Sequence, residues 1–163
     1  IREDNVQTSK IVDHYCMSID DSEKEYYIGG IISDFLAKKG QDSHILLNQE
    51  EVERIGTSGN VPVPLEMLHG DFQQLKDKKY FTILKMGVSM LIATNVAARG
   101  LDFPHIDLII QLHPPSTTDS YIHRSGRTGR INNRGACVTL YSWNEEYLIG
   151  RIQMEAKIKM ERL

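Results

Sequence analysis

Several features that decide the class of a protein are scarce or missing in this 163-residue sequence. There are only two cysteines, Cys16 and Cys137, and they lie too far apart for the short spacings of a zinc site. We therefore expect neither a disulfide framework nor a zinc site, and a reduced intracellular environment suits the chain. No apolar run approaches the roughly 20 residues that a membrane-spanning helix needs, so we expect no membrane partner.

A general excess of positive charge is also missing. Nineteen basic side chains stand against 22 acidic ones, which gives a net charge of −3. A protein that coats nucleic acid by bulk electrostatics has the opposite balance, so any binding of phosphate must be local. The arginines are distributed accordingly, because five of the nine lie in one short region: Arg99, Arg124, Arg127, Arg130 and Arg134.

The densest part of that region is the stretch 121–130, which reads Tyr-Ile-His-Arg-Ser-Gly-Arg-Thr-Gly-Arg. Arginine presents a planar fork of donors that matches phosphate oxygens, and glycine lets the backbone approach other groups closely. A helix that ends at Ser125 and unwinds at Gly126 would leave His123 and Arg127 near one face. The pattern indicates a device for binding anions. The alternative is a solvated helix end whose cations complement the helix dipole.

Strands and helices alternate along the chain. Apolar and β-branched runs predict strands at 11–17, 44–47, 65–68, 90–94, 107–112 and 136–141. Amphipathic spacing and capping residues predict helices at 23–39, 50–55, 71–84, 116–125 and 144–159, with Ser116 as the N-cap of the fourth. This order predicts an α/β fold, a mostly parallel sheet with helices on both faces, formed by residues 11–163 after an arm at 1–10.

In parallel sheets, ligands gather at the carboxyl ends of the strands. Three polar segments follow predicted strands, namely 69–71, 94–102 and the arginine stretch 121–130. We therefore expect all three segments at that edge of the sheet.

Three motifs occur in order: Leu-His-Gly-Asp at 68–71, Ala-Thr-Asn-Val-Ala-Ala-Arg-Gly-Leu-Asp at 93–102, and the stretch 121–130. Together they resemble the C-terminal RecA-like half of DEAD-box RNA helicases, and the resemblance covers essentially the whole chain. It implies that the sheet is RecA-like and that the full protein is an ATP-dependent RNA helicase.

A weaker likeness concerns the subfamily. Asn95, Ser125 and the segment 145–147 resemble the nucleolar RNA helicase II (Gu) group. That likeness implies a nuclear or nucleolar location. Without it, we expect the protein in the cytoplasm.

The family resemblance assigns four residues to a nucleotide. Arg127 and Arg130 match arginine fingers that reach the γ-phosphate of an ATP held mainly by the other domain, where they would stabilise transition-state charge. His123 matches a residue that links the two domains and couples nucleotide to RNA. Asp102 matches a carboxylate that bonds the ATP ribose, although without the motif it reads as a turn or cap aspartate.

The resemblance assigns five further residues to RNA. Gly70, Asp71 and Gln74 match positions near the RNA backbone. Thr94 matches a threonine that bonds an RNA phosphate, and Arg99 matches a residue that bridges the RNA and nucleotide sites. Contacts of this kind read the backbone, so we expect binding that tolerates changes of RNA sequence and is sensitive to salt.

The sequence departs from the family pattern in two places. Asp77 stands where the family usually has an arginine, three residues after Gln74, and residues 45–50 lack the usual threonine. These departures leave open a non-catalytic alternative, an RNA-binding or partner-docking RecA-like module. A DNA-directed or processive helicase is a further alternative, which His123 disfavours because such relatives usually carry glutamine there.

Two motifs of ATP hydrolysis are absent, the Gly-x-x-x-x-Gly-Lys-Ser/Thr phosphate loop and the Asp-Glu-Ala-Asp box. The resemblance therefore implies that the cofactor ATP, with Mg²⁺, is held by an N-terminal RecA-like domain of the same protein. RNA and that domain are the expected partners. We expect this chain alone not to hydrolyse ATP, and we predict no metal ligands within it.

Overall fold

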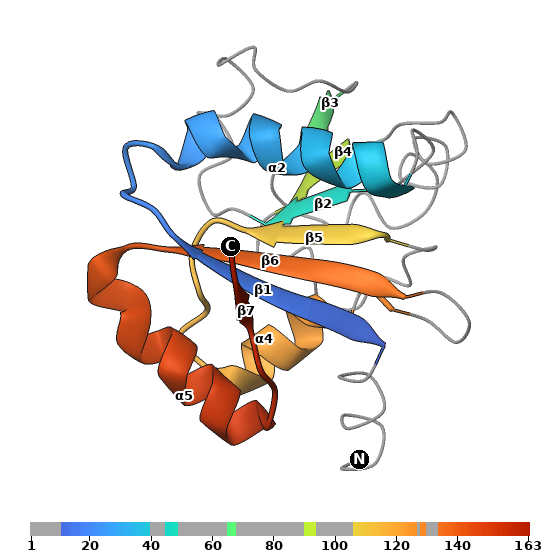
Figure 1. Cartoon of the computed structure of the whole chain (residues 1–163). Helices are drawn as coiled ribbons and strands as arrows, with labels where there is room; N and C mark the ends of the chain where they lie inside the picture. Colours follow the sequence, from blue (N-terminus) through green and yellow to red (C-terminus); the bar gives the residue numbers. More distant parts are fainter. Residues whose placement is uncertain are drawn as a thin grey trace.

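The computed structural model describes residues 11–39, 45–48, 65–67, 90–93, 106–126, 128–129 and 134–163. The seven strands among these residues form one parallel sheet in the order β3-β4-β2-β5-β6-β1-β7 (Figure 1). Their bounds are Val12–Ser18 (β1), Ile45–Asn48 (β2), Leu65–Met67 (β3), Met90–Ala93 (β4), Leu108–Gln111 (β5), Gly135–Tyr141 (β6) and Glu161–Arg162 (β7). The predicted parallel sheet of an α/β fold is confirmed.

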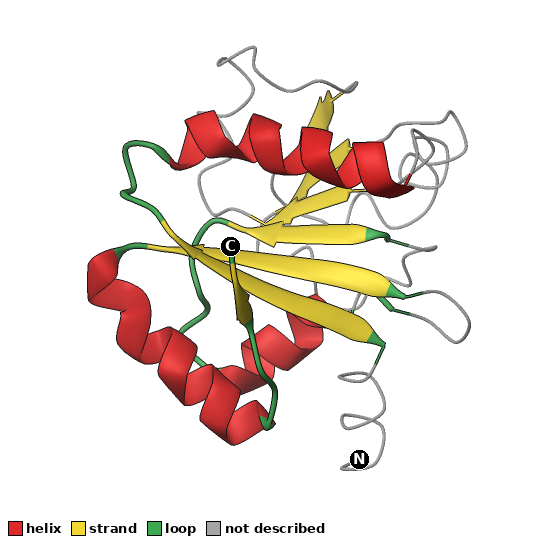
Figure 2. Cartoon of the chain, in the orientation of Figure 1, coloured by secondary structure: helices red, strands yellow, loops and turns green. Residues whose placement is uncertain are grey.

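Helices cover both faces of this sheet, as predicted. Helix α2, Lys24–Lys39, lies over one face, whereas α4, Thr118–Ser125, and α5, Glu146–Ala156, lie over the other (Figure 2). Because both faces are covered, every residue of β5 and β6 is buried. The sequences of these two strands, Leu-Ile-Ile-Gln and Gly-Ala-Cys-Val-Thr-Leu-Tyr, are accordingly short of charge.

The core between α2 and the sheet is apolar. Ile28 and Ile32, one helical turn apart on α2, are 1% and 0% exposed and belong to one cluster with alternate residues of β5 and β6. The strand residues of this cluster are Leu108, Ile110, Ala136, Val138 and Leu140. Full burial of an aliphatic side chain of this size contributes about 1.5–3 kcal/mol, so this layer is a main source of stability.

The residues between them point to the other face, toward α4 and α5, and several are polar. β5 places Gln111 there, β6 places Cys137 and Thr139, and β1 places His14. All four are at most 8% exposed. Tyr121 of α4 packs against them and is 1% exposed. One face of the sheet is therefore apolar, and the other carries buried polar groups.

Two helices differ from the predictions at one end, and one strand was not predicted. Helix α4 is capped by Thr117, whose hydroxyl oxygen accepts the Ser120 N–H at 3.2 Å, and not by Ser116. Helix α5 follows a short 3-10 turn (η2, Trp143–Glu145) and ends at Ala156, earlier than predicted, because Lys157 adopts the left-handed region at φ 54°. Strand β7 was not predicted, since two exposed polar residues carry no strand pattern.

One further prediction, the end of α4, is confirmed, and three others lie outside the described residues. Helix α4 ends at Ser125, before Gly126, as predicted. The predicted arm at 1–10 and the predicted helices at 50–55 and 71–84 lie outside the described residues. Within the described part of the chain, no helix combines the length and the apolar character needed to cross a membrane.

Candidate functional site

Helix α4 carries the arginine stretch from one edge of the sheet to the other. It begins after the carboxyl end of β5, and just beyond its end Thr128 forms a parallel bridge with Ile106, which precedes β5. The eight residues of α4 rise about 12 Å, close to the length of a four-residue strand, so the chain returns to the amino edge. The expectation that this stretch lies at the carboxyl edge is therefore wrong for Thr128 and Gly129.

The amino ends of the strands hold Thr128 and Gly129 in place. The Thr128 hydroxyl donates to the Ile106 carbonyl. Gly129 adopts φ +71°, and a Cβ there would lie 2.6 Å from Val12 Cγ2, so glycine is required. Gly135 packs so closely on Thr128 that a Cβ would collide with it. This part of the arginine stretch is thus fastened to the sheet.

His123 and Arg124 are neighbours in the last turn of α4 but have different surroundings. His123 is exposed, which leaves it available to a second domain. Arg124 is half-buried and donates from Nη1 to Gln111 Oε1 at 3.1 Å, so its guanidinium is directed at the sheet. Of the two basic residues of the stretch that the structure describes in α4, His123 therefore faces outward and Arg124 anchors the helix.

The other predicted site residues lie outside the described residues: Asp102, Arg127, Arg130, Gly70, Asp71, Gln74, Thr94 and Arg99. The structure nevertheless describes the strands that precede the RNA-side residues in sequence. β3 and β4, which precede the two RNA-side segments, are adjacent and parallel, with Met67 paired to Ile92. The carboxyl ends of β3 and β4, which precede the two RNA-side segments in sequence, are therefore neighbours.

The described residues nearest in sequence to the predicted nucleotide-side residues lie at the amino edge of the sheet. Ile106 follows Asp102 closely in sequence, and Thr128 stands between Arg127 and Arg130. The bridge between Ile106 and Thr128 joins these two parts of the chain before the amino end of β5. The described residues next to the two predicted sides, Met67 and Ala93 on one hand and Ile106 and Thr128 on the other, thus lie at opposite edges of the sheet.

A hydrogen-bonded layer under α4 was missed by the sequence analysis. Gln111 Nε2 donates to Cys137 Sγ and to Thr139 Oγ1, both at 3.3 Å, and Tyr121 Oη lies 2.7 Å from His14 Nδ1. Burial lowers the pKa of His14 to about 4 and raises the pKa of the Cys137 thiol to about 11, so both groups are neutral at pH 7. The one signal in the sequence was Gln111, a polar residue inside an apolar strand.

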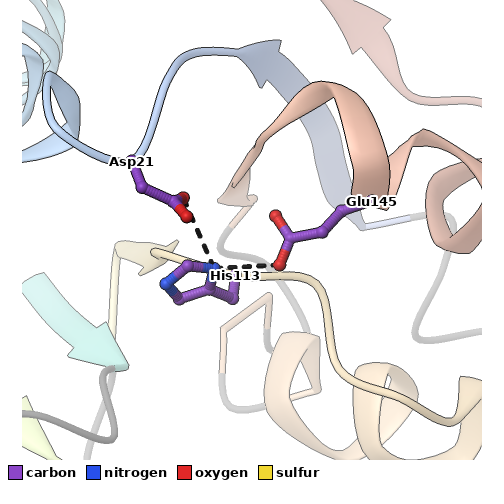
Figure 3. Close-up of side chains that lie close together, drawn as sticks. All are labelled: Asp21, His113 and Glu145. Atoms are coloured by element: carbon purple, nitrogen blue, oxygen red, sulfur yellow. Dashed lines mark hydrogen bonds and ion pairs between the residues drawn. The ribbon is translucent and has the colours of Figure 1, made fainter.

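A second polar cluster lies where the loops after β1, β5 and β6 meet. Asp21, His113 and Glu145 each offer one ligand atom, and these atoms lie within 4.8 Å of one another (Figure 3). The ammonium of Lys24 is already among them, with Nζ 2.8 Å from Asp21 Oδ1, 3.0 Å from His113 Nδ1 and 3.5 Å from Glu145 Oε2. Because this ammonium supplies the cation, the cluster fits an internal ion-pair network better than a metal centre.

The contacts within this cluster stabilise the charged forms of its carboxylates. Lys24 is only 3% exposed, and its hydrogen bond lowers the pKa of Asp21. Burial acts to raise the pKa of Glu145, but hydrogen bonds from Ser142, together with the nearby His113 and Lys24, lower it overall. Both carboxylates are therefore ionised at pH 7, and the network joins three loops at the carboxyl edge.

Comparisons with known proteins identify relatives of this chain. The family described as helicase conserved C-terminal domain matches residues 30–132. Nucleolar RNA helicase 2 of Rattus norvegicus is 33% identical over 153 residues, which cover 93% of this chain and 20% of that protein. The chain thus spans about a fifth of the length of this curated relative. The expected likeness to nucleolar RNA helicases is confirmed.

Solved structures share the fold. A DEAD box protein from the hyperthermophile Methanococcus jannaschii has a TM-score of 0.76 and 22% identity, and the match covers 95% of this chain and 42% of that chain. S. cerevisiae Dbp5 bound to RNA and ADP BeF3 has a TM-score of 0.74 and 21% identity, with 94% of this chain and 41% of that chain covered. The family match, the relatives and the fold together show that the chain belongs to the helicase conserved C-terminal domain family and is the C-terminal RecA-like domain of a DEAD-box helicase.

Proposed function

We propose that this domain works in an ATP-dependent RNA helicase, where it supplies arginine fingers and contacts to the RNA backbone for local unwinding. It acts together with an N-terminal RecA-like domain of the same protein, which holds ATP and Mg²⁺. The observation that carries the proposal is the bridge between Ile106 and Thr128, because Ile106 closely follows Asp102 in sequence and Thr128 stands between Arg127 and Arg130.

This bridge supports a nucleotide side at the amino edge of the sheet. Ile106, which lies four residues after Asp102, pairs with Thr128, which lies between Arg127 and Arg130 in sequence. A carboxylate can accept hydrogen bonds from ribose hydroxyls, and guanidinium groups can donate to the γ-phosphate. A phosphoryl transition state spreads negative charge over several oxygens, and an arginine finger accelerates the reaction about 10³- to 10⁵-fold.

The RNA side is proposed at the carboxyl ends of β3 and β4. Gly70, Asp71 and Gln74 follow β3, while Thr94 and Arg99 follow the adjacent β4. Backbone N–H groups and hydroxyls at such positions suit phosphate oxygens, which carry no sequence information. The structure of Dbp5 contains RNA and ADP BeF3, and the shared fold supports the same two classes of ligand for this chain.

Helix α4 connects the two proposed sides. It starts at the carboxyl edge and ends at the amino edge, with the exposed His123 in its last turn. In the proposed mechanism, ATP and RNA bind between the two domains and close them. Closure brings the fingers to the γ-phosphate and bends one RNA strand, which parts a short duplex locally.

The test of this function uses the full-length protein with Arg127→Ala and Arg130→Ala. Each substitution is expected to lower kcat of RNA-stimulated ATP hydrolysis about 10³-fold or more, because charge in the transition state loses its partner. Arg134→Ala is the matched control, since Arg134 lies at the same edge but is bound to Asp13 at 2.7 and 2.8 Å. Its kcat is expected to equal that of the wild type.

Unchanged hydrolysis in both finger variants would reject the proposal and favour a non-catalytic RNA-binding or partner-docking module.

The likeness to nucleolar RNA helicase 2 further supports a nuclear or nucleolar location. Microscopy of the tagged full-length protein tests that location.

A further inference from the structure

Gln111 stands at the end of β5 with its side chain 0% exposed. A buried amide destabilises the fold unless its donors and acceptor are paired. Here Nε2 donates to Cys137 Sγ and Thr139 Oγ1, each at 3.3 Å, and Oε1 accepts from Arg124 Nη1 at 3.1 Å. A guanidinium group can only donate, so the amide oxygen must face Arg124. The contacts therefore select one orientation of the amide, with its oxygen toward α4.

A second anchor lies on the same side of α4. Tyr121 is 1% exposed, and its Oη lies 2.7 Å from His14 Nδ1 on β1. Tyr121 and Arg124 are three residues apart, so they share one face of the helix. β5 and β1 lie on either side of β6, so the two anchors fasten α4 across three strands. His123, between them in sequence, is exposed.

We propose that Gln111 is a positioning residue, which fixes through Arg124 the rotation of α4 about its own axis. That rotation sets the direction in which His123 faces the partner domain. The inference deepens the proposed function and rests on it. A rotation of roughly 20° moves a side-chain end about 6 Å from the helix axis by about 2 Å. A displacement of about 1 Å at reacting groups can already cost about 10²-fold in rate.

The first experiment uses Gln111→Met in the full-length protein. Methionine has a similar length but offers neither the acceptor for Arg124 nor the two donors. The kcat of RNA-stimulated ATP hydrolysis is expected to fall about 10- to 100-fold, because the reacting groups are misplaced. The KM for ATP is expected to change less than about twofold, because the other domain holds the nucleotide. Gln111→Glu keeps an acceptor for Arg124, and the Thr139 hydroxyl and Cys137 thiol can donate to its other carboxylate oxygen, so kcat is expected to return to within about threefold of the wild type.

Ile110→Val is the matched control for a loss of stability. Ile110 neighbours Gln111 in β5 and is equally buried, but it packs in the core under α2. Its truncation is expected to lower the thermal midpoint while leaving kcat unchanged. A wild-type kcat in Gln111→Met, or an equal loss of kcat in Ile110→Val, would overturn the proposal.

If Gln111→Met does not fold, Thr139→Val takes its place, because it removes one partner of the Gln111 amide. Its kcat is expected to fall about three- to tenfold through the less firmly held amide, and a wild-type kcat would overturn the inference.

Amide hydrogen exchange tests the same inference without any enzymatic activity. In the folded variant, the amides of α4 are expected to exchange at least about tenfold faster than in the wild type, while those of α2 keep their rates. Equal protection of α4 would overturn the positioning role. Faster exchange of α4 combined with inert finger substitutions would refute the proposed function alone.

Discussion

The two faces of the sheet are built from different side chains, although the same strands form both. Toward α2, β5 and β6 present aliphatic residues such as Ile110 and Leu140. Toward α4, the residues next to them in sequence are Gln111 and Thr139, which are equally buried but hydrogen-bonded. β1 adds His14 to this second face.

The difference teaches how one sheet can hold two helices for different purposes. Hydrophobic burial has no direction, so an apolar face tolerates small rotations of the helix that covers it. Hydrogen bonds require alignment of donor and acceptor, so a polar face selects one orientation. Between its ends, helix α2 covers the apolar core, whereas α4 also presents His123. The polar face therefore lies under the helix whose orientation matters for the proposed function.

The largest expected difference between the two faces concerns two neighbouring residues of β6, Leu140 and Thr139. Leu140→Ala, on the α2 face, should lower the free energy of unfolding by about 2–5 kcal/mol, because it leaves a cavity in a packed layer. Thr139→Val keeps the shape of the side chain and should cost less than about 2 kcal/mol, through one hydrogen bond to Gln111. Urea denaturation measures both. Equal losses would show that the two faces contribute alike to stability.

Acid is expected to weaken the polar face. The pKa of His14 is 6.5 in an unfolded chain, and burial lowers it to about 4 in the folded domain. Between these values the unfolded chain binds a proton that the folded domain does not bind. The contribution of His14 to the free energy of unfolding should therefore fall as the pH drops from 6.5 to 4, by on the order of 3 kcal/mol in total, and change no further below pH 4. Urea denaturation at a series of pH values measures this slope.

His14→Gln is the control for the acid effect, because glutamine does not titrate. The pKa values of Asp21 and Glu145 are lowered in the folded domain, so their contributions are present above about pH 4.5 and are lost only at lower pH. The slope between pH 6.5 and 4.5 should thus be flatter in His14→Gln. The same slope in both proteins would contradict the assignment to His14.

The smallest expected difference in the free energy of unfolding is between two hydroxyl residues at the start of α4. Thr117→Ala removes the oxygen that accepts the Ser120 N–H and should lower the free energy of unfolding by about 0.5–2 kcal/mol. Ser116→Ala is the matched control, since it removes a neighbouring hydroxyl that does not cap the helix. Chemical denaturation compares the two. A larger loss in Ser116→Ala would reinstate the cap predicted from the sequence.

Features that depend on a local pattern could be predicted from the sequence. The apolar runs 90–94 and 107–112 predicted β4 and β5 almost to the residue, because a strand covered on both faces must be nearly free of charge. Gly126 predicted the end of α4. The motifs also predicted the family. Of the predicted site residues, His123 lies in the described part of the chain, where it is exposed, and the roles of all of them stay predictions.

Features that depend on distant partners could not be predicted. Nothing near Gln111 in the sequence shows that Arg124 will bind its amide. The position of Thr128 at the amino edge arises because the eight residues of α4 and the four residues of β5 span similar distances. A sequence motif does not contain this information. Lys24 looks like a solvated helix residue, yet its partners come from loops after three different strands.

Lys24 also has a consequence for how the carboxyl edge is assembled. The cation among Asp21, His113 and Glu145 is covalently part of the chain, so each molecule carries one of its own. The junction of the three loops therefore does not draw on the ions of the surrounding solution, and a chelator has nothing to extract from it. It is completed when α2, which begins at Lys24, folds onto the sheet.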